Sequence, residues 1–137
     1  MSTTIRPEVS KRNKYWISRH RYYELKHLCL QYKELKTEYN NLLDFEASQP
    51  IEKVKSSSLV SKTEKIAILR LSYAKRINAI EASVRETDDF FQNYILRAVT
   101  EGLSYQTLKA RFDIPCGKDM WYEIYRKFFF ILNAKRE

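Results

Sequence analysis

Residues 104–132 read SYQTLKARFDIPCGKDMWYEIYRKFFFIL, and this stretch decides how the rest of the chain is interpreted. A short helix over 105–112 is predicted, because Ser104 is a favourable N-cap residue and Pro115 disfavours helical backbone in the residue before it. The turn of about five residues that follows leads into a longer helix. A short helix, a turn and a longer helix together make the helix-turn-helix arrangement.

The longer helix is predicted to start near 117–119 and to end at about 133. Its apolar side chains recur at helical spacing, which predicts one buried stripe. The residues expected to be buried in the whole motif are Leu108, Phe112, Ile114, Trp121, Ile124 or Tyr125, Phe128, and Ile131 or Leu132. The opposite surface of the longer helix is expected to present Lys118, Asp119, Tyr122, Glu123 and Arg126.

That polar surface contains side chains suited to reading DNA, since the second helix of such a motif enters the major groove. Arg126 and Lys118 can donate to guanine O6 and N7 or to phosphate, and Tyr122 can contact a thymine methyl group or a phosphate. Asp119 fits a helix cap, or an acceptor for cytosine N4. A pair of helices that only pack against each other is the competing interpretation.

The composition extends the helical interpretation to the whole chain. Its 137 residues fit one compact domain or two small modules, and they include only 2 Gly and 3 Pro. These are too few for the turns of a sandwich, a barrel or a multi-loop α/β enzyme, so we predict an all-α protein. No apolar run approaches the ~18 residues of a membrane span, and the first residues lack the apolar segment of a secretion signal. An intracellular, soluble protein with no membrane partner is expected.

Two apolar repeats predict long helices on either side of a polar linker over 49–60 (QPIEKVKSSSLV), which is expected to be disordered. The first repeat consists of Leu25, Leu28, Tyr32, Leu35, Tyr39 and Leu42, and the second of Ile66, Leu69, Tyr73, Ile77, Ile80 and Val84. Their spacings are those of a short coiled-coil seam, and Ser61 with Glu64 fits a capping box at the start of the second helix. Residues 13–86 are therefore predicted to form an N-terminal long-helix hairpin.

Residues 87–137 are predicted to form the C-terminal helix-turn-helix module, whose first helix is capped by Asp88 or Asp89 and ended by Gly102. The consecutive phenylalanines 128–130 span about 200° of helix, so at least one of them must lie outside the core. An exposed aromatic residue on a small protein often marks an interface. We therefore expect a homodimer whose contact is made by Tyr125, Phe129 and Phe130.

The basic residues gather near the N-terminus. The formal net charge is +8, and residues 1–27 contain seven basic but only two acidic side chains. Such a segment favours contact with polyanions. Residues 1–12 are expected to form a flexible basic arm, and Arg19 and Arg21 are expected to contact phosphates. The competing interpretation is a solvated helix face whose tyrosines, Tyr22 and Tyr23, pack on the next helix.

Catalytic chemistry has little support in the sequence. His20, Glu24 and His27 lie on roughly one helix face, but they do not close a metal site without further ligands. Cys116 lies near a helix N-terminus, which can lower a thiol pKa, yet neither it nor Cys29 has an obvious activating base. Two glycines cannot form a phosphate-cradling loop. We expect no catalytic residues, no metal and no cofactor, and a protein that is not an enzyme.

Three stretches carry a resemblance to a known family: 94–105 (YILRAVTEGLSY), 114–119 (IPCGKD) with the aromatic helix after it, and 20–27 (HRYYELKH). They resemble small proteins of Gram-positive prophages that are related in pattern to the RinA and ArpU late-gene transcriptional regulators. The likeness covers most of the chain and is weakest between 46 and 62. It implies a helix-turn-helix similar to region four of bacterial sigma factors, acting on double-stranded DNA in the cytoplasm of a bacterial host cell.

Together with the surface analysis, the resemblance predicts a DNA-contacting set. Its members are Arg19, Arg21, Ser104, Tyr105, Lys109, Lys118, Tyr122, Arg126 and Lys127. The chain departs from the family pattern in two ways. The turn over 113–118 is longer than in the sigma-type motif, and Ile124 and Tyr125 stand where the related prophage proteins tend to be basic.

Two other functions are compatible with the same sequence. A phage accessory protein could bind and inhibit a host protein such as a defence nuclease, in the manner of an anti-CRISPR protein. Its exposed aromatic residues would be Tyr122, Tyr125, Phe129 and Phe130. A host partner, where there is one, is expected to be RNA polymerase or a defence nuclease. A small terminase-like packaging subunit would instead assemble as a ring on viral DNA, whereas a DNA regulator should be a dimer.

Overall fold

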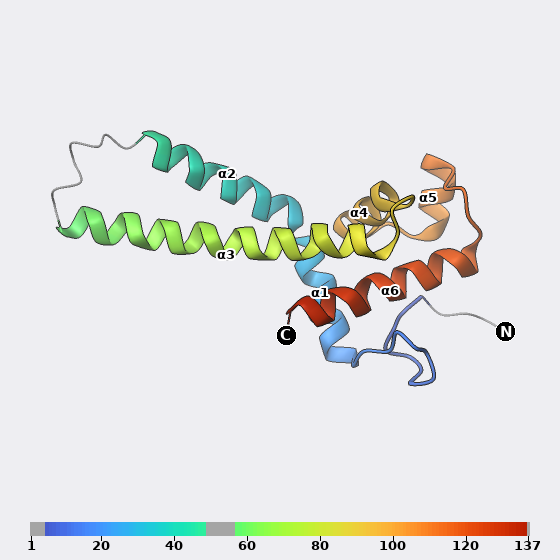
Figure 1. Cartoon of the computed structure of the whole chain (residues 1–137). Coiled ribbons are helices and arrows are strands. Elements are labelled where there is room, and N and C mark those ends of the chain that lie inside the picture. The colour runs from blue at the N-terminus through green and yellow to red at the C-terminus, as the bar shows by residue number, and fades with distance from the viewer. Residues whose placement is uncertain (1–4, 49–56, 137) are drawn as a thin grey trace. The chain divides into compact units, whose positions relative to one another are not determined.

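The computed structural model describes residues 5–48 and 57–136, with side chains described for 5–48 and 61–136. These residues form helices, turns and bends, and no β-strand is found among them. The helices are α1 (Arg19–Leu30), α2 (Tyr32–Ser48), α3 (Ser57–Thr87), α4 (Gln92–Glu101), α5 (Tyr105–Phe112) and α6 (Lys118–Arg136) (Figure 1). The predicted all-α class is confirmed.

The chain forms two compact units whose boundaries differ from the predicted ones. The core unit comprises Met1–Gln31 and Ala79–Glu137, and the two-helix unit comprises Tyr32–Asn78. The predicted boundaries were 13–86 and 87–137. The difference arises because α1 packs against α4 and α6, so the N-terminal helix joins the C-terminal ones in a single core.

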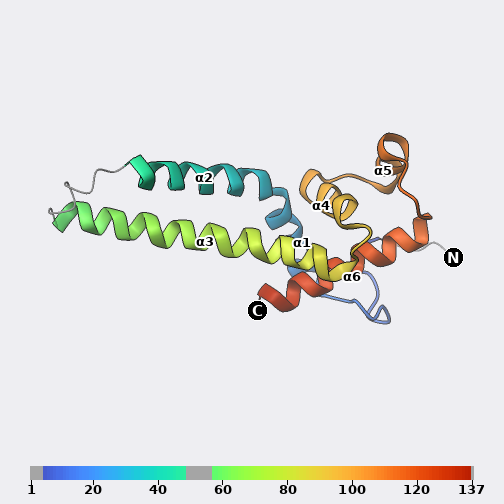
Figure 2. The same cartoon turned by 45° about the horizontal axis from the view of Figure 1, so that its top comes forward.

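The two-helix unit consists of α2 and the part of α3 up to Asn78. Figures 1 and 2 show these helices lying side by side. A salt bridge joins Arg70 Nε to Glu46 Oε1 at 2.9 Å, and Lys62 Nζ lies 5.6 Å from the centre of the Phe45 ring. Leu69 was predicted to lie on the buried seam, but its side chain is 43% exposed, so that prediction is wrong.

The first predicted helix is interrupted at Gln31. The backbone N–H of Gln31 is shared between the carbonyls of Leu28 at 3.1 Å and His27 at 3.2 Å, as is common at helix ends. The predicted seam stays buried on both sides of the break, at Leu28 and at Tyr32. The seam residues up to Leu28 belong to the core unit, and those from Tyr32 onward belong to the two-helix unit, so one apolar stripe contributes to both units.

The start of α3 also differs from its prediction. The helix includes Ser57, so Ser61 lies inside it and does not act as an N-cap. Residues 57–60 of the predicted linker are therefore helical, and residues 49–56 lie outside the described residues. The capping-box pattern of Ser61 and Glu64 does not set the start of the helix, because the residues before Ser61 also adopt helical backbone.

A turn organised by Asp88 separates α3 from α4. Asp88 Oδ1 accepts from the backbone N–H groups of Phe90 at 2.9 Å and Phe91 at 3.2 Å. The N-cap position of α4 is Phe91, so the prediction that Asp88 or Asp89 caps this helix is wrong by two to three residues. The predicted end is confirmed, because Gly102 adopts the left-handed conformation with φ of 69°.

The core unit is built around aromatic side chains from α1 and α6. Tyr22, Trp121, Phe128 and Phe129 are among its largest fully buried side chains. The N-terminal segment packs on this core, since Pro7 is buried and Trp16 Nε1 donates to the carbonyl of Glu8 at 3.2 Å. Within the predicted flexible arm, Pro7 is therefore packed in the core, whereas residues 9–12 are exposed and residues 1–4 lie outside the described residues.

Candidate nucleic-acid interface

The helix α5 has the bounds predicted from the sequence. Ser104 Oγ accepts from the backbone N–H of Thr107 at 3.2 Å, which satisfies one of the free donors at the helix start. The helix ends at Phe112, and the C-cap residue after it, Asp113, adopts a left-handed conformation with φ of 48°. The backbone N–H of Asp113 bonds to the carbonyl of Lys109 at 3.1 Å, so the chain turns sharply away from the helix axis.

The turn between α5 and α6 is held by side chains from α5. The hydroxyl of Tyr105 donates to the carbonyl of Cys116 at 2.8 Å, and Lys109 Nζ donates to the carbonyl of Ile114 at 3.2 Å. Lys109 also lies 3.3 Å from Asp113 Oδ1. Ile114 itself is fully buried, as predicted for a plug. These contacts fix the turn, and they occupy Tyr105 and Lys109, both of which were predicted to contact DNA.

The first turns of α6 are open to solvent. Lys118, Asp119 and Glu123 are exposed and Tyr122 is half-buried, while the adjacent Trp121 is fully buried in the core. The helix is therefore amphipathic in the predicted register. A Cβ atom built at the preceding residue, Gly117, would meet nothing within 4 Å, so the space directly beside this residue is open.

The basic side chains on this surface differ in their solvent exposure. Lys118 Nζ lies 5.5 Å from the centre of the Tyr122 ring, so the ammonium and the ring form one exposed cation–π pair. Arg126 and Lys127 are half-buried, and the Nε atom of Arg126 is shielded from solvent. The expectation that Arg126 projects freely from the surface is therefore only partly right.

Glu123 places a negative charge beside the predicted reading surface. Its carboxylate Oε1 lies 3.3 Å from Lys14 Nζ, which comes from the N-terminal segment. Hydrogen bonding with Glu123 is the main cause that raises the pKa of Lys14. The pair offsets the carboxylate charge that would otherwise repel phosphate, although both side chains stay largely solvated and the energy of the pair is small.

The aromatic interface predicted on α6 is mostly part of the core. Tyr125 and Phe129 are buried, with Phe129 only 1% exposed, so the prediction that they form an exposed contact surface is wrong. The reason is the phase of the helix, which turns both residues toward α1. Phe130 is 42% exposed and lies 5.7 Å from Tyr15 between ring centres. One of the three consecutive phenylalanines thus lies outside the core, as predicted.

A buried hydroxyl pair joins α1 to α6. The Tyr22 and Tyr125 hydroxyl oxygens are 2.8 Å apart in the core. Burial raises the pKa of both groups, because the phenolate form would lose its hydration. The sequence showed two tyrosines 103 positions apart, and no local pattern indicated that their hydroxyls would meet.

The two arginines predicted to contact phosphates are not equivalent. Arg19 is exposed at the first position of α1. Arg21 is half-buried, and its Nε donates to Asn133 Oδ1 at 2.6 Å while its Nη1 pairs with Glu24. Arg21 therefore links α1 to the end of α6, and of the two guanidinium groups only that of Arg19 is presented openly to a polyanion.

Neither cysteine is an activated thiol. Cys29 is fully buried, and burial raises its pKa. Burial also raises the pKa of the half-buried Cys116, with Lys109 opposing the effect. The suggestion that a helix start lowers the pKa of Cys116 is therefore wrong in direction. Within residues 5–48 and 57–136, no group of three or more His, Cys, Asp or Glu side chains is placed to hold a metal ion.

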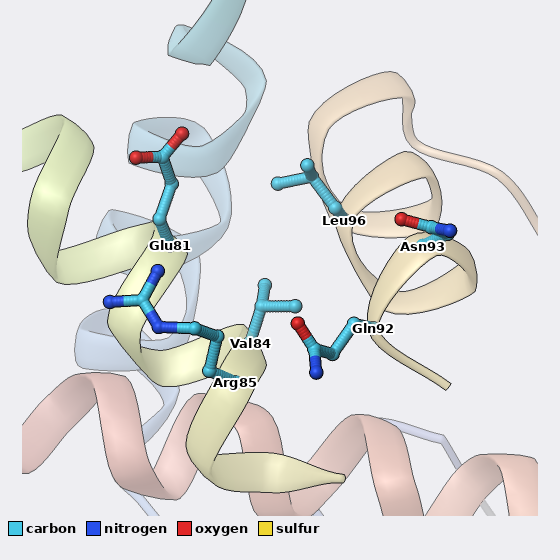
Figure 3. A pocket seen from close by; sticks show the side chains of 6 residues that line it. All are labelled: Glu81, Val84, Arg85, Gln92, Asn93 and Leu96. Atoms are coloured by element: carbon cyan, nitrogen blue, oxygen red, sulfur yellow. The ribbon is translucent and has the colours of Figure 1, made fainter. Parts of the chain in front are cut away.

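A small hollow of about 220 Å³ lies between the end of α3 and α4 (Figure 3). Glu81, Val84 and Arg85 line it from α3, and Gln92, Asn93 and Leu96 line it from α4. Glu81 and Arg85, the charged residues on its α3 side, have opposite signs, so the hollow favours neither an anionic nor a cationic ligand. No residue of the predicted DNA-contacting set lines it.

An exposed aromatic groove on α4 and α5 was not predicted from the sequence. It has a volume of about 420 Å³ and is lined by Phe90, Asn93, Tyr94, Arg97 and Phe112. Phe90 is largely exposed, and the guanidinium of Arg97 lies 4.8 Å from the centre of the Phe112 ring. Arg97 and Phe112 are fifteen positions apart in sequence, which explains why no periodic pattern revealed the pair.

Comparison with known proteins gives no relative for this chain. No protein-family model, no curated protein and no solved structure matches it. Within the described part of the chain, every helix is too short or too polar to cross a lipid bilayer.

Proposed function

We propose that this chain is a DNA-binding protein of a phage or mobile element, a transcriptional regulator that reads duplex DNA with α6. The observation that carries the proposal is the fixed turn between α5 and α6. The buried Ile114 and the hydrogen bonds from Tyr105 and Lys109 hold the two helices as one motif, and the first turns of α6 stay open to solvent. A helix-turn-helix needs this combination of a rigid turn and an open recognition helix.

The exposed side chains of α6 divide by chemistry. Lys118 can donate to a phosphate or to guanine O6 and N7, and the half-buried Tyr122 beside it can contact a phosphate or a thymine methyl group. Asp119 favours the helix start and can accept from cytosine N4. The open N-terminus of α6 adds backbone N–H groups suited to a phosphate.

Arg19 supplies a separate phosphate contact in this proposal, because it is the exposed member of the N-terminal arginine pair. Arg126 and Lys127 have half-buried side chains and contribute less directly. Tyr105, Lys109 and Arg21 act as positioning residues, since their polar atoms hold the turn and the end of α6. Ser104 likewise caps α5.

Fluorescence anisotropy with labelled duplex DNA at several salt concentrations tests the proposal. Lys118→Ala should weaken binding and lower the slope of log K against log salt by up to about 0.9, the value for one phosphate contact. A contact to a base would instead relax sequence preference at one position. Lys65→Ala, which removes an exposed lysine of the two-helix unit, is the matched control and should change neither quantity. Equal effects of the two variants would refute the role of α6.

The alternative of a phage accessory protein that inhibits a host protein loses part of its support. Tyr125 and Phe129, two of the four aromatic residues predicted to be exposed, are buried in the core. Phe130 and the half-buried Tyr122 stay accessible, and the groove beside Phe90 and Arg97 is a further aromatic surface that such a partner could use. Pull-down from host lysate with and without nuclease treatment separates the two proposals, since capture through DNA is lost on nuclease treatment.

A further inference from the structure

The outer side of α3 in the two-helix unit exposes two large apolar residues. Ile68 is 68% exposed and Leu71 is 58% exposed. They are three positions apart and therefore adjacent on one helix face. Arg70 marks the side of α3 that faces α2, because its guanidinium pairs with Glu46. Successive helix residues are about 100° apart, so Ile68, two positions before Arg70, lies on nearly the opposite side of the helix. Adjacent exposed apolar side chains of this kind often mark an interface.

Charged residues flank this apolar pair in an ordered way. Glu64 stands four residues before Ile68, and Lys75 stands four residues after Leu71, both exposed and on the same side of the helix. The spacing of four, three and four is that of a coiled-coil seam. Among the described residues, neither Glu64 nor Lys75 is paired with an opposite charge of its own chain.

We propose that this face of α3 is the contact of a homodimer in which two copies of α3 pack antiparallel. The two-fold axis passes between Leu69 and Arg70. Ile68 of one copy then meets Leu71 of the other, and Glu64 meets Lys75, twice each by symmetry. The exposed polar residues Ser61 and Asn78 also fall opposite each other and extend the contact.

The charges select the antiparallel arrangement. In a parallel pair of α3 helices, Glu64 would face Glu64 and Lys75 would face Lys75, and like charges at such positions are destabilising. In the antiparallel pair all four charges face their opposites. The apolar contact contains only two side chains from each copy, so the dimer is expected to be weak, concentration-dependent and sensitive to salt.

This dimer goes beyond the proposed function, because it needs no nucleic acid and uses none of the DNA-contacting residues. It also differs from the predicted dimer contact through α6, of which only Phe130 remains exposed. Sedimentation equilibrium of the full chain without DNA measures it directly, so failure of the dimer and failure of DNA binding give separate results.

Charge reversal is the decisive test. Glu64→Lys and Lys75→Glu should each raise the dissociation constant of the dimer about tenfold or more, because each reverses two symmetry-related pairs. The double variant Glu64→Lys/Lys75→Glu restores opposite charges and should dimerise like the wild type. An equimolar mixture of the two single variants should form a heterodimer, since every charge then faces its opposite across the antiparallel contact.

Two further variants control for other contacts. Glu38→Lys reverses an exposed charge on α2 and should leave the dissociation constant unchanged. Phe130→Glu should also leave it unchanged, and loss of the dimer in that variant would move the contact to α6. Circular dichroism of each variant confirms that helicity is retained. A monomer at all concentrations, a larger ring, or a double variant as weak as the single ones would overturn the proposal.

Discussion

The hydrogen bond between Tyr22 and Tyr125 can be measured by a double-mutant cycle in the core unit. The two hydroxyl oxygens are 2.8 Å apart, and both side chains are buried. Replacing either tyrosine by phenylalanine removes one hydroxyl and leaves the other buried without this bond. The cost of such a group is about 1–3 kcal/mol. Tyr22→Phe and Tyr125→Phe should therefore each lower the free energy of unfolding by about 1–2 kcal/mol.

The double variant provides the test of this reasoning. Tyr22→Phe/Tyr125→Phe leaves no unpaired hydroxyl and preserves the ring contact, whose centres are 6.4 Å apart. Its loss of stability should be smaller than the sum of the single losses by about 1 kcal/mol or more. Urea unfolding followed by tryptophan fluorescence is suitable, because Trp16 and Trp121 both lie in the core unit. Strictly additive losses would refute the coupling.

The same pair predicts how stability depends on pH. Burial raises the pKa of both tyrosines above the ordinary value of about 10. Below that value both states keep the protons, and the contribution of the pair to stability is complete. Above it the unfolded chain releases protons that the folded chain retains, so stability falls as the pH rises. The fall should be smaller in the double phenylalanine variant, and Tyr73→Phe in the two-helix unit is the control.

Three further outcomes follow from the contacts described above. Arg19→Ala should lower the slope of log K against log salt for DNA binding by up to about 0.9, with little change in thermal stability. Arg21→Ala should lower thermal stability, because the variant loses the hydrogen bond to Asn133. Phe129→Glu should prevent folding of the core unit and Phe130→Glu should not, as circular dichroism would show; equal helicity would contradict the burial of Phe129. Ile114→Ala should lower the free energy of unfolding by about 2–4 kcal/mol and weaken DNA binding, and a stable variant with unchanged affinity would contradict the role of the turn.

Helix ends with local determinants could be predicted from the sequence. The bounds of α5 follow from Ser104 and from the turn after Phe112, and the end of α4 follows from Gly102. These signals act through the hydrogen bonds and backbone conformation of a few neighbouring residues. The break at Gln31 has no such signal, because no glycine or proline marks it. It depends on α1 packing in one unit and α2 in the other, which is a tertiary effect.

The sequence predicted where the candidate interface lies, but only some of the residues that are open to DNA there. Lys118 and Tyr122 lie on the exposed face of α6, where the apolar periodicity placed them. Tyr105 and Lys109 have the side chains of a DNA contact but bond to carbonyls of the turn. A residue type does not distinguish a phosphate acceptor from a backbone acceptor, because both satisfy the same donors. Only the distances to Cys116 O and Ile114 O decide between them.

The two proposals together constrain the DNA that the protein should recognise. An antiparallel contact between two α3 helices has two-fold symmetry, and each such dimer carries two copies of α6. Proteins that read DNA as two-fold dimers recognise inverted repeats. Selection from a random duplex pool should therefore give inverted repeats with the wild type and single half-sites with Glu64→Lys. Direct repeats, or inverted repeats that persist in Glu64→Lys, would show that the DNA-bound dimer uses a different contact.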